Sequence, residues 1–330
     1  MSADLLEVVE AAYRVEQAPV AWLASASTAV ERQFARGFIS SYFVDCSDGG
    51  FRRWAPAWTA GAPPAATALY DEYDRFVPLA MRRAIHTFAP CGSNDDLPEP
   101  SEDSDWFTRE TARWSVFGVN AIDVTLRGCC FSRWELRATS VRTTEKEIED
   151  WSRLSAHLAA GARLTHALEG LAPLDHAEAI IEPSGKLVHA SGQARGKLAR
   201  EALRSEARAQ DRARTRRGRA SGADAVAAWQ ALVKGRWSVL DHFDRDGRRF
   251  VVAQPNEPLP ATRRALTARE RQVATAASLG HSNKLIAYEL GLDPSTVAKL
   301  LARARAKLGV GTRVELVATL QAPDEPEPSR

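Results

Sequence analysis

Apolar side chains recur at helical spacing through residues 266–316, and two glycines divide the run. Thr267 precedes Glu270 by three residues, which fits a capping box at the start of a first helix, and Gly280 is placed to end it. Gly291 supplies the residue that turns with a positive φ after a second helix. The positions expected to be buried in that second helix are Leu285, Ile286 and Leu290.

A third, longer helix is predicted to begin after this turn. Asp293 suits the N-cap and Pro294 suits the first helical position, where its missing amide costs nothing. The expected apolar stripe is Val297, Leu300 or Leu301, Ala304 and Leu308, and the opposite face carries Thr296, Lys299, Arg303, Arg305 and Lys307. A fourth helix over residues 313–320 shows Val314, Leu316, Val317 and Leu320. The segment is therefore expected to be a four-helix, all-α unit with a helix-turn-helix at its centre.

This segment resembles the DNA-binding domain of LuxR-type transcription regulators, a four-helix module within the wider helix-turn-helix group. Two positions depart from the family pattern: Leu300 stands where a histidine is common, and Asp293 replaces a frequent serine. The matching residues are Leu266, Thr267, Arg269, Glu270, Val273, Gly280, Ser282, Asn283, Lys284, Ile286, Ala287, Leu290, Thr296, Val297, Lys307, Leu308, Gly309, Val310 and Arg313.

Positive charge is concentrated in the same segment. Residues 261–320 hold ten Lys and Arg against four Asp and Glu, a net charge of +6, whereas the whole chain is only +2. A basic helical unit of this kind is suited to the phosphates of double-stranded DNA, with a binding constant that falls as salt rises. A solvated charged face explains the charge alone equally well, so the turn, the caps and the motif favour DNA.

Within this unit, base-edge contacts and phosphate contacts are expected from different side chains. Lys299 is suited to guanine O6 and N7, and two alanines are suited to thymine methyl groups. The residues near the start of the third helix expected to reach base edges are Thr296, Ala298, Lys299 and Ala302, with Ser295 in the same DNA-binding set. The residues expected to hold phosphates are Lys284, Arg303, Arg305 and Lys307. A capping hydroxyl is the alternative role for Thr296.

Residues 1–172 are expected to form one sensor-sized α/β domain. The pattern predicts helices over 4–15, 28–36, 69–88 and 144–168, strands over 37–45, 119–127 and 134–142, and an exposed acidic loop over 95–105. This order of elements resembles a GAF-type sensor fold. Six tryptophans are expected to fill its core, and one or two of them to line a ligand cavity: Trp54, Trp58, Trp106, Trp114, Trp134 and Trp151.

Residues 175–254 are expected to form a small, reduced PAS-like α+β unit. Hairpins are predicted over 179–190 and 237–253, with a basic helix over 195–217 between them. That helix is suited to DNA flanks, to a second subunit or simply to solvent. A linker over 255–262, the helix-turn-helix DNA-binding domain (called the reader below) over 263–321 and a disordered tail over 322–330 complete a multidomain α+β chain.

The sequence carries no recognisable catalytic or metal-binding constellation. It lacks a glycine-rich phosphate loop and the H-E-x-x-H and G-x-S-x-G motifs, and its seven histidines are scattered, so neither enzymatic activity nor a cofactor is expected. Cys46, Cys91, Cys129 and Cys130 fit neither a disulfide framework nor a zinc site, and buried small side chains are the default interpretation. A redox or arsenic sensor is the sharper alternative for the adjacent pair. With no apolar run of membrane-spanning length and no leader pattern, a cytoplasmic protein is expected.

Together these patterns predict a DNA-binding transcription regulator controlled by an N-terminal sensory region. The expected partners are double-stranded DNA, RNA polymerase, a small-molecule ligand of the N-terminal region, and a second copy paired through residues 312–320. The alternatives are a sigma-type initiation factor, which the strand-rich front disfavours, and an enzyme with a DNA-binding appendage.

Overall fold

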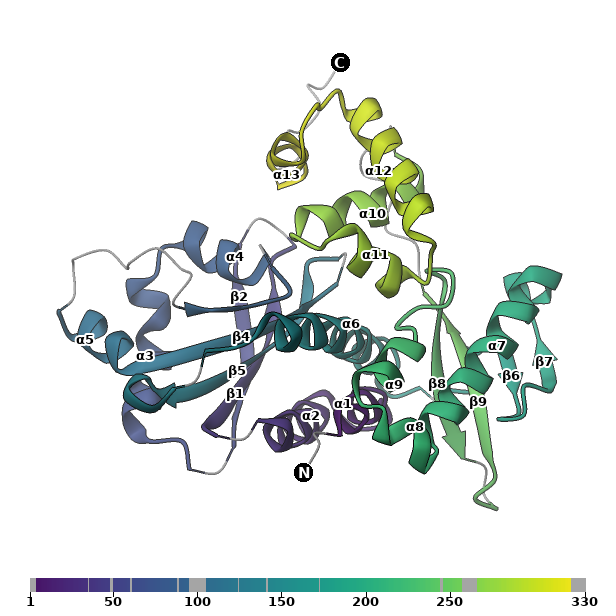
Figure 1. The fold of residues 1–330 in the computed structure, drawn as a ribbon, viewed down its shortest axis with the longest axis horizontal. Coiled ribbons are helices and arrows are strands. Elements are labelled where there is room, and N and C mark those ends of the chain that lie inside the picture. The colour runs from purple at the N-terminus through teal and green to yellow at the C-terminus, as the bar shows by residue number, and fades with distance from the viewer. Residues whose placement is uncertain are drawn as a thin grey trace.

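The computed structural model describes residues 4–34, 36–47, 50–59, 61–87, 89–94, 105–123, 125–140, 142–171, 173–243, 246–256 and 266–321. Two antiparallel sheets and a C-terminal group of helices follow one another along the chain, in a mixed α+β architecture (Figure 1). The expected disordered tail and most of the expected linker lie outside the described residues.

The first sheet has five antiparallel strands in the order β2-β1-β5-β4-β3. Every residue of β1 is buried, because helices cover both faces of the sheet at this strand. The strands are β1 (Phe38–Asp45), β2 (Arg52–Trp58), β3 (Cys91–Ser93), β4 (Trp114–Ile122) and β5 (Arg127–Leu136).

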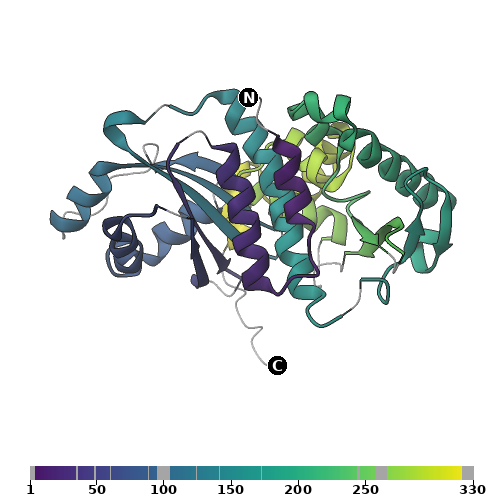
Figure 2. The same cartoon turned by 90° about the horizontal axis from the view of Figure 1, so that it is seen from below.

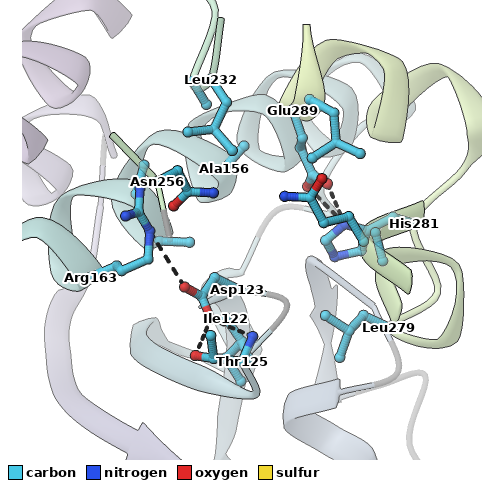
Figure 3. A pocket seen from close by; sticks show the side chains of 16 residues that line it. Ile122, Asp123, Thr125, Ala156, Arg163, Leu232, Asn256, Leu279, His281 and Glu289 are labelled. Carbon is cyan, nitrogen blue, oxygen red and sulfur yellow. Dashed lines mark hydrogen bonds and ion pairs between the residues drawn. The ribbon is translucent and has the colours of Figure 1, made fainter. Parts of the chain in front are cut away.

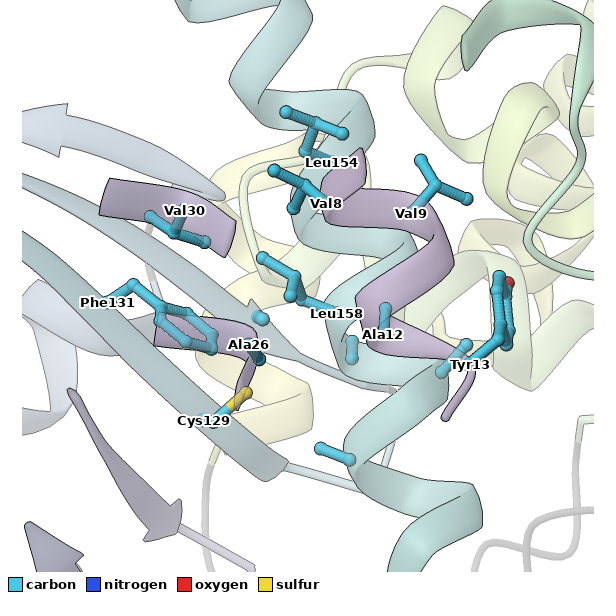
Figure 4. Close-up of a cluster of buried hydrophobic side chains, with 14 of the residues drawn as sticks. Val8, Val9, Ala12, Tyr13, Ala26, Val30, Cys129, Phe131, Leu154 and Leu158 are labelled. Atoms are coloured by element: carbon cyan, nitrogen blue, oxygen red, sulfur yellow. The ribbon is translucent and has the colours of Figure 1, made fainter. Parts of the chain in front are cut away.

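Three helices lie side by side across one face of this sheet: α1 (Leu5–Ala12), α2 (Pro19–Gln33) and α6 (Glu145–Ala167) (Figure 2). Their apolar side chains meet those of the sheet in the main core, where Leu154 and Leu158 of α6 belong to one cluster with Phe131 of β5 (Figure 4). Gly161 lets α6 cross α1 closely, because a Cβ there would overlap the Ala12 carbonyl and the Trp22 ring. The Trp22 indole donates a 2.9 Å hydrogen bond to that same carbonyl, which holds it in place.

The opposite face of the sheet is lined by aromatic rings. Phe38 packs against Trp58, Trp114 and Trp134, with ring centroids 5.5–6.2 Å apart. The helices α3 (Pro64–Phe76) and α4 (Leu79–Thr87) add their apolar side chains to this layer, and α5 (Asp105–Arg113) precedes β4. The adjacent Cys129 and Cys130 are both buried and point into different clusters on opposite faces, as strand alternation requires.

The second sheet is four-stranded and antiparallel, in the order β7-β6-β9-β8. Its strands are β6 (Ala179–Ile181), β7 (Leu187–Ala190), β8 (Trp237–Phe243) and β9 (Arg249–Pro255), and the helices α7 (Lys197–Arg214), α8 (Arg216–Ala220) and α9 (Ala223–Ala228) lie between the two hairpins in sequence. Both predicted hairpins are confirmed. Trp229, Leu240 and Val252 belong to the same core as α1 and α6, so the two sheet regions share one apolar interior.

Ion pairs tie the basic segment 195–217 and its continuation to the front of the chain. Arg214 Nη2 lies 2.6 Å from Asp241 Oδ2, and Arg214 Nε lies 3.3 Å from Glu10 Oε1. Arg219 Nη2 lies 2.5 Å from Glu10 Oε1, and Arg219 Nη1 lies 2.8 Å from Asp4 Oδ2. At least this end of the basic helix therefore serves the internal packing of the chain rather than a surface open to solvent or DNA.

Several predicted boundaries were wrong. The strands expected over 119–127 and 134–142 are β4 and β5, which lie five to seven residues earlier, and β2 was not expected. The turn that joins β4 to β5 contains no glycine or proline: Asp123 Oδ1 accepts from the Thr125 amide at 2.7 Å, and Leu126 takes a φ of 62°. An apolar residue in a left-handed conformation hides the turn from pattern analysis. The helix expected over 69–88 is two helices, interrupted before Leu79.

Gly161→Ala tests the close crossing of α1 and α6. Alanine favours an isolated helix over glycine by up to about 1 kcal/mol, but here its methyl group forces two helices apart, so we expect a net destabilisation of about 1–3 kcal/mol in urea unfolding. Gly92→Ala is the matched control, because a Cβ at that glycine of β3 meets open space. An unchanged or higher stability of Gly161→Ala would mean that the two helices are not held at this distance.

Candidate nucleic-acid interface

Four helices form the C-terminal group: α10 (Ala268–Ser278), α11 (Asn283–Leu290), α12 (Pro294–Leu308) and α13 (Arg313–Gln321). The predicted capping box is present at α10, where the Glu270 amide donates to the Thr267 hydroxyl at 3.3 Å and the Thr267 amide donates to Glu270 Oε2 at 2.8 Å. Both contacts satisfy amides that the first turn of a helix leaves without partners.

The turn between α11 and α12 has the predicted geometry. Ser282 caps α11 by accepting from the Leu285 amide at 3.2 Å, and Gly291 ends it with φ 57° and ψ 45°. Asp293 Oδ1 then accepts from the Ser295 amide at 2.8 Å and caps α12, with Pro294 at the first position. Gly291 is also pressed against the segment before β8, because a Cβ there would overlap the Leu232 carbonyl. This glycine therefore has two independent reasons to lack a side chain.

The four helices enclose a core of their own. Val273, Ile286, Leu290, Val297 and Ala304 are buried there with Leu301, and Leu300 is only partly buried, which resolves the alternative between the two leucines. Leu316 of α13 has 0% exposure within this core. Its side chain packs α13 against α10 and is not available to a second copy.

The outward face of α12 carries most of the side chains that the sequence singled out. The residues exposed on it are Ser295, Thr296, Ala298, Lys299, Ala302 and Arg303. Neither Lys299 nor Arg303 forms an ion pair with any residue that the structure describes, so both charges are available to a ligand. The hydroxyl of Thr296 likewise has no hydrogen-bond partner among the described residues. The cap of α12 is Asp293, so the alternative role of Thr296 as a cap does not hold.

Other cations of this unit are used inside the protein. Lys307 Nζ lies 2.7 Å from Glu270 Oε2, and Arg313 Nη2 donates to the carbonyls of Ala277, at 2.9 Å, and of His281. Arg305 is only partly exposed. A count of charged residues includes these groups because sequence does not show their partners. The exposed cations of α12 left without a partner among the described residues are therefore Lys299 and Arg303, near the middle of the helix.

Lys284, at the start of α11, is paired with the front of the chain. Its Nζ lies 2.6 Å from Glu149 Oε1 of α6, although 76% of the lysine side chain remains exposed. The first turns of α6 also carry Glu145, Glu147 and Asp150. An expected phosphate ligand thus faces a negatively charged helix end.

Tyr288 of α11 anchors the same contact more deeply. Its hydroxyl donates to the Val226 carbonyl at 2.6 Å or to the Trp229 carbonyl at 2.9 Å, and lies 2.7 Å from His157 Nε2. Since a hydroxyl has one proton, we assign the proton of His157 to Nε2, which leaves Nδ1 to accept from the Tyr13 hydroxyl 3.0 Å away. Burial lowers the pKa of His157 to about 3, so the ring is neutral. Pattern analysis offers no signal for this contact, because a single tyrosine in a short helix fits an exposed position equally well.

The described residues contain no group of three or more His, Cys, Asp and Glu side chains placed to hold a metal ion. Among the described helices, none combines the length and the apolar character needed to cross a membrane.

The sequence model of one family, bacterial regulatory proteins of the luxR family, matches residues 264–320. The match covers α10 to α13, so this part of the chain is a luxR-family helix-turn-helix domain, as its motif indicated. No curated protein matches the chain.

The Glu270–Lys307 pair makes a pH-dependent contribution to stability. Lys307 and the Thr267 hydrogen bonds lower the pKa of Glu270 from 4.5 to about 2. A lowered carboxyl pKa stabilises the folded state above the unfolded value, and this contribution is lost as pH falls from about 4.5 towards about 2. Lys307→Met should raise the pKa of Glu270 and weaken that dependence, seen as a smaller difference between thermal midpoints at neutral and acidic pH. Lys299→Met, which removes an unpaired lysine of the same helix, should leave the difference unchanged; equal behaviour of the two variants would refute the assignment.

Proposed function

We propose that the protein is a transcription regulator that binds double-stranded DNA through the outward face of α12 and is controlled by its front region. The observation that carries the proposal is the exposed face of α12, with Lys299 and Arg303 unpaired among the described residues, on a domain of the luxR family. In a helix-turn-helix the second helix enters the major groove while the first crosses the backbone, which suits α12 and α11 respectively. No observation favours the initiation-factor or enzyme alternatives.

We assign the base contacts to Thr296, Ala298, Lys299 and Ala302, with Ser295 beside them, and the phosphate contacts to Arg303 and Lys284. Arg305 and Lys307 are weaker candidates, because one is half-buried and the other is paired with Glu270. Contact with RNA polymerase and pairing of two copies along residues 312–320 belong to the same proposal. The surface of α13 that pairing would use excludes the buried Leu316.

Control by the front region is proposed to act through the contact between α6 and α11. In the described arrangement Glu149 holds Lys284, and three further acids stand in the first turns of α6. A phosphate at the start of α11 would meet these carboxylates, and like charges repel one another across an interface. DNA binding therefore requires that the contact loosen, which makes the front region a brake on the reader. A GAF-like sensory role for the first sheet is proposed on this basis.

Selection of bound fragments from a genomic library by the full chain identifies the operator and tests the proposal as a whole. On that operator, Lys299→Ala should lose about 1–3 kcal/mol of binding free energy and relax specificity at one base position. Arg303→Ala should weaken all sequences alike and reduce the slope of log K against log salt by about 0.9. Lys186→Ala, an exposed lysine of the β6–β7 turn, is the control. The assignment fails if both variants lose affinity equally across random sequences.

Glu149→Gln tests the brake. Removing this charge should raise DNA affinity by up to about fivefold, since exposed ion pairs are worth about 0.2–1 kcal/mol. Glu169→Gln removes an exposed acid just beyond the other end of α6 and should change nothing. Fluorescence anisotropy with labelled operator DNA measures both variants. Affinity that stays constant or falls in Glu149→Gln would contradict a braking role for α6.

A further inference from the structure

A pocket lies where the front of the chain meets the DNA-binding domain, and it is built from both. The space inside it that a water-sized sphere can occupy is about 80 Å³, and the pocket opens to solvent. The front contributes the β4–β5 turn, α6, the segment before β8 and the end of β9, and the reader contributes α10, the turn after it and α11 (Figure 3). A molecule held in this pocket would touch both parts of the protein.

The acidic side chains of the pocket have hydrogen-bond partners within the protein, whereas its arginine has few. Asp123 Oδ1 already accepts from the Thr125 amide and hydroxyl, and both oxygens of Glu289 lie within 2.9 Å of His281 Nδ1. The guanidinium of Arg163 makes one hydrogen bond to a described residue, from Nη2 to Ser238 Oγ at 2.8 Å. Asp123 and Glu289 therefore already accept hydrogen bonds from the protein, whereas most N–H groups of Arg163 have no acceptor among the described residues.

The ion pair of Arg163 with Asp123 is loose. Its Nε stands 3.6 Å from Asp123 Oδ2, and 20% of the arginine side chain is exposed. Burial lowers the pKa of Arg163 and raises that of Asp123, so the attraction between them does not offset their loss of water. Beside them the side-chain amide of Asn256, which lines the same wall, has no partner among the described residues. The unmet hydrogen-bond capacity in this pocket is therefore that of the Arg163 guanidinium and the Asn256 amide.

The remaining wall is apolar. It consists mainly of Ala156, Ala159 and Ala160 of α6, Leu232 before β8, and Leu279 and Leu290 of the C-terminal domain. Three of these side chains are small alanines of α6, and apolar walls with a few convergent polar groups are typical of small-molecule sites.

We propose that this pocket binds a small organic monocarboxylate, whose carboxylate pairs with Arg163 and whose apolar body lies against the alanines of α6. A planar guanidinium is matched to a carboxylate, which accepts two parallel hydrogen bonds from it. A second carboxylate would face Asp123 and Glu289, which selects against dianions. An amine would find both acids already engaged.

The position of the pocket gives the ligand a definite effect on DNA binding, and this step rests on the proposed function. A ligand that fits between α6 and the helices α10 and α11 stabilises the arrangement in which they are docked. That arrangement holds Lys284 on Glu149 and Tyr288 on His157. The carboxylate therefore strengthens the brake, and by linkage DNA weakens binding of the carboxylate by the same factor.

Isothermal titration calorimetry of the full chain with hexanoate and with benzoate tests the site without DNA. Hexanamide and benzamide, which match the acids in shape but carry no charge, are the ligand controls. We expect the acids to bind at least about tenfold more tightly than the amides. Arg163→Gln should abolish this preference, and Lys146→Gln, which removes an exposed lysine of the same helix, should keep it. Equal binding of acids and amides, no binding of either acid, or an unchanged preference in Arg163→Gln overturns the proposal.

Asp123→Asn provides a test that survives if Arg163→Gln fails to fold. It removes the charge that competes for Arg163, so we expect tighter binding of the acids with no change for the amides; weaker or unchanged binding of the acids counts against the site.

Operator DNA forms the second arm: hexanoate should raise the dissociation constant of the wild-type protein for DNA and leave that of Arg163→Gln unaffected. If hexanoate binds but DNA affinity does not fall, the linkage is wrong and the site stands. If no DNA binds at all, the proposed function fails while calorimetry still decides the site.

Discussion

A buried chain of hydrogen bonds from Tyr13 through His157 to Tyr288 joins the first helix, the longest helix and the DNA-binding domain. In the arrangement assigned above, Tyr288 gives its proton to the carbonyl of Val226 or Trp229, and the neutral imidazole of His157 donates from Nε2 and accepts at Nδ1. Breaking the chain would leave buried polar atoms without partners, which is costly in a low-dielectric interior. The relative placement of the front region and the DNA-binding domain depends on this contact.

The long helix α6 is the element through which the parts of the molecule are connected. One side of it packs on the five-stranded sheet and on α1, which the bare Gly161 permits to come close. Its other side meets α11 through His157 and Glu149 and lines the pocket with three alanines. A shift of α6 caused by the sheet would therefore change the contacts of α6 with the DNA-binding domain directly. No separate relay is needed, because the same helix belongs to both surfaces.

The DNA-binding domain divides its cations between two tasks. Lys307 and Arg313 hold helices together through Glu270 and through the carbonyls that end α10, whereas Lys299 and Arg303 face outward. Lys284 stands between the two groups, exposed yet paired with α6. Its partner in the docked arrangement is a carboxylate, and its proposed partner on DNA is a phosphate. That shared demand for one ammonium group is the physical basis of the proposed brake.

The local signals of the chain were sufficient where short-range chemistry decides the structure. The capping box at Thr267, the glycine turn at 291 and the proline start of α12 were all predicted, since each involves residues a few positions apart. The strand boundaries around Leu126 were not predicted correctly, because this residue takes a left-handed conformation in the turn. An apolar side chain gives no indication of that conformation. Which cations are free, which tyrosine is buried and where a pocket forms depend on residues from about thirty to more than a hundred positions away. Only the tertiary structure places Glu149 next to Lys284 and Arg163 at the edge of the DNA-binding domain. Burial and charge pairing between distant residues produce no periodic pattern in the sequence, so they could not be predicted from it.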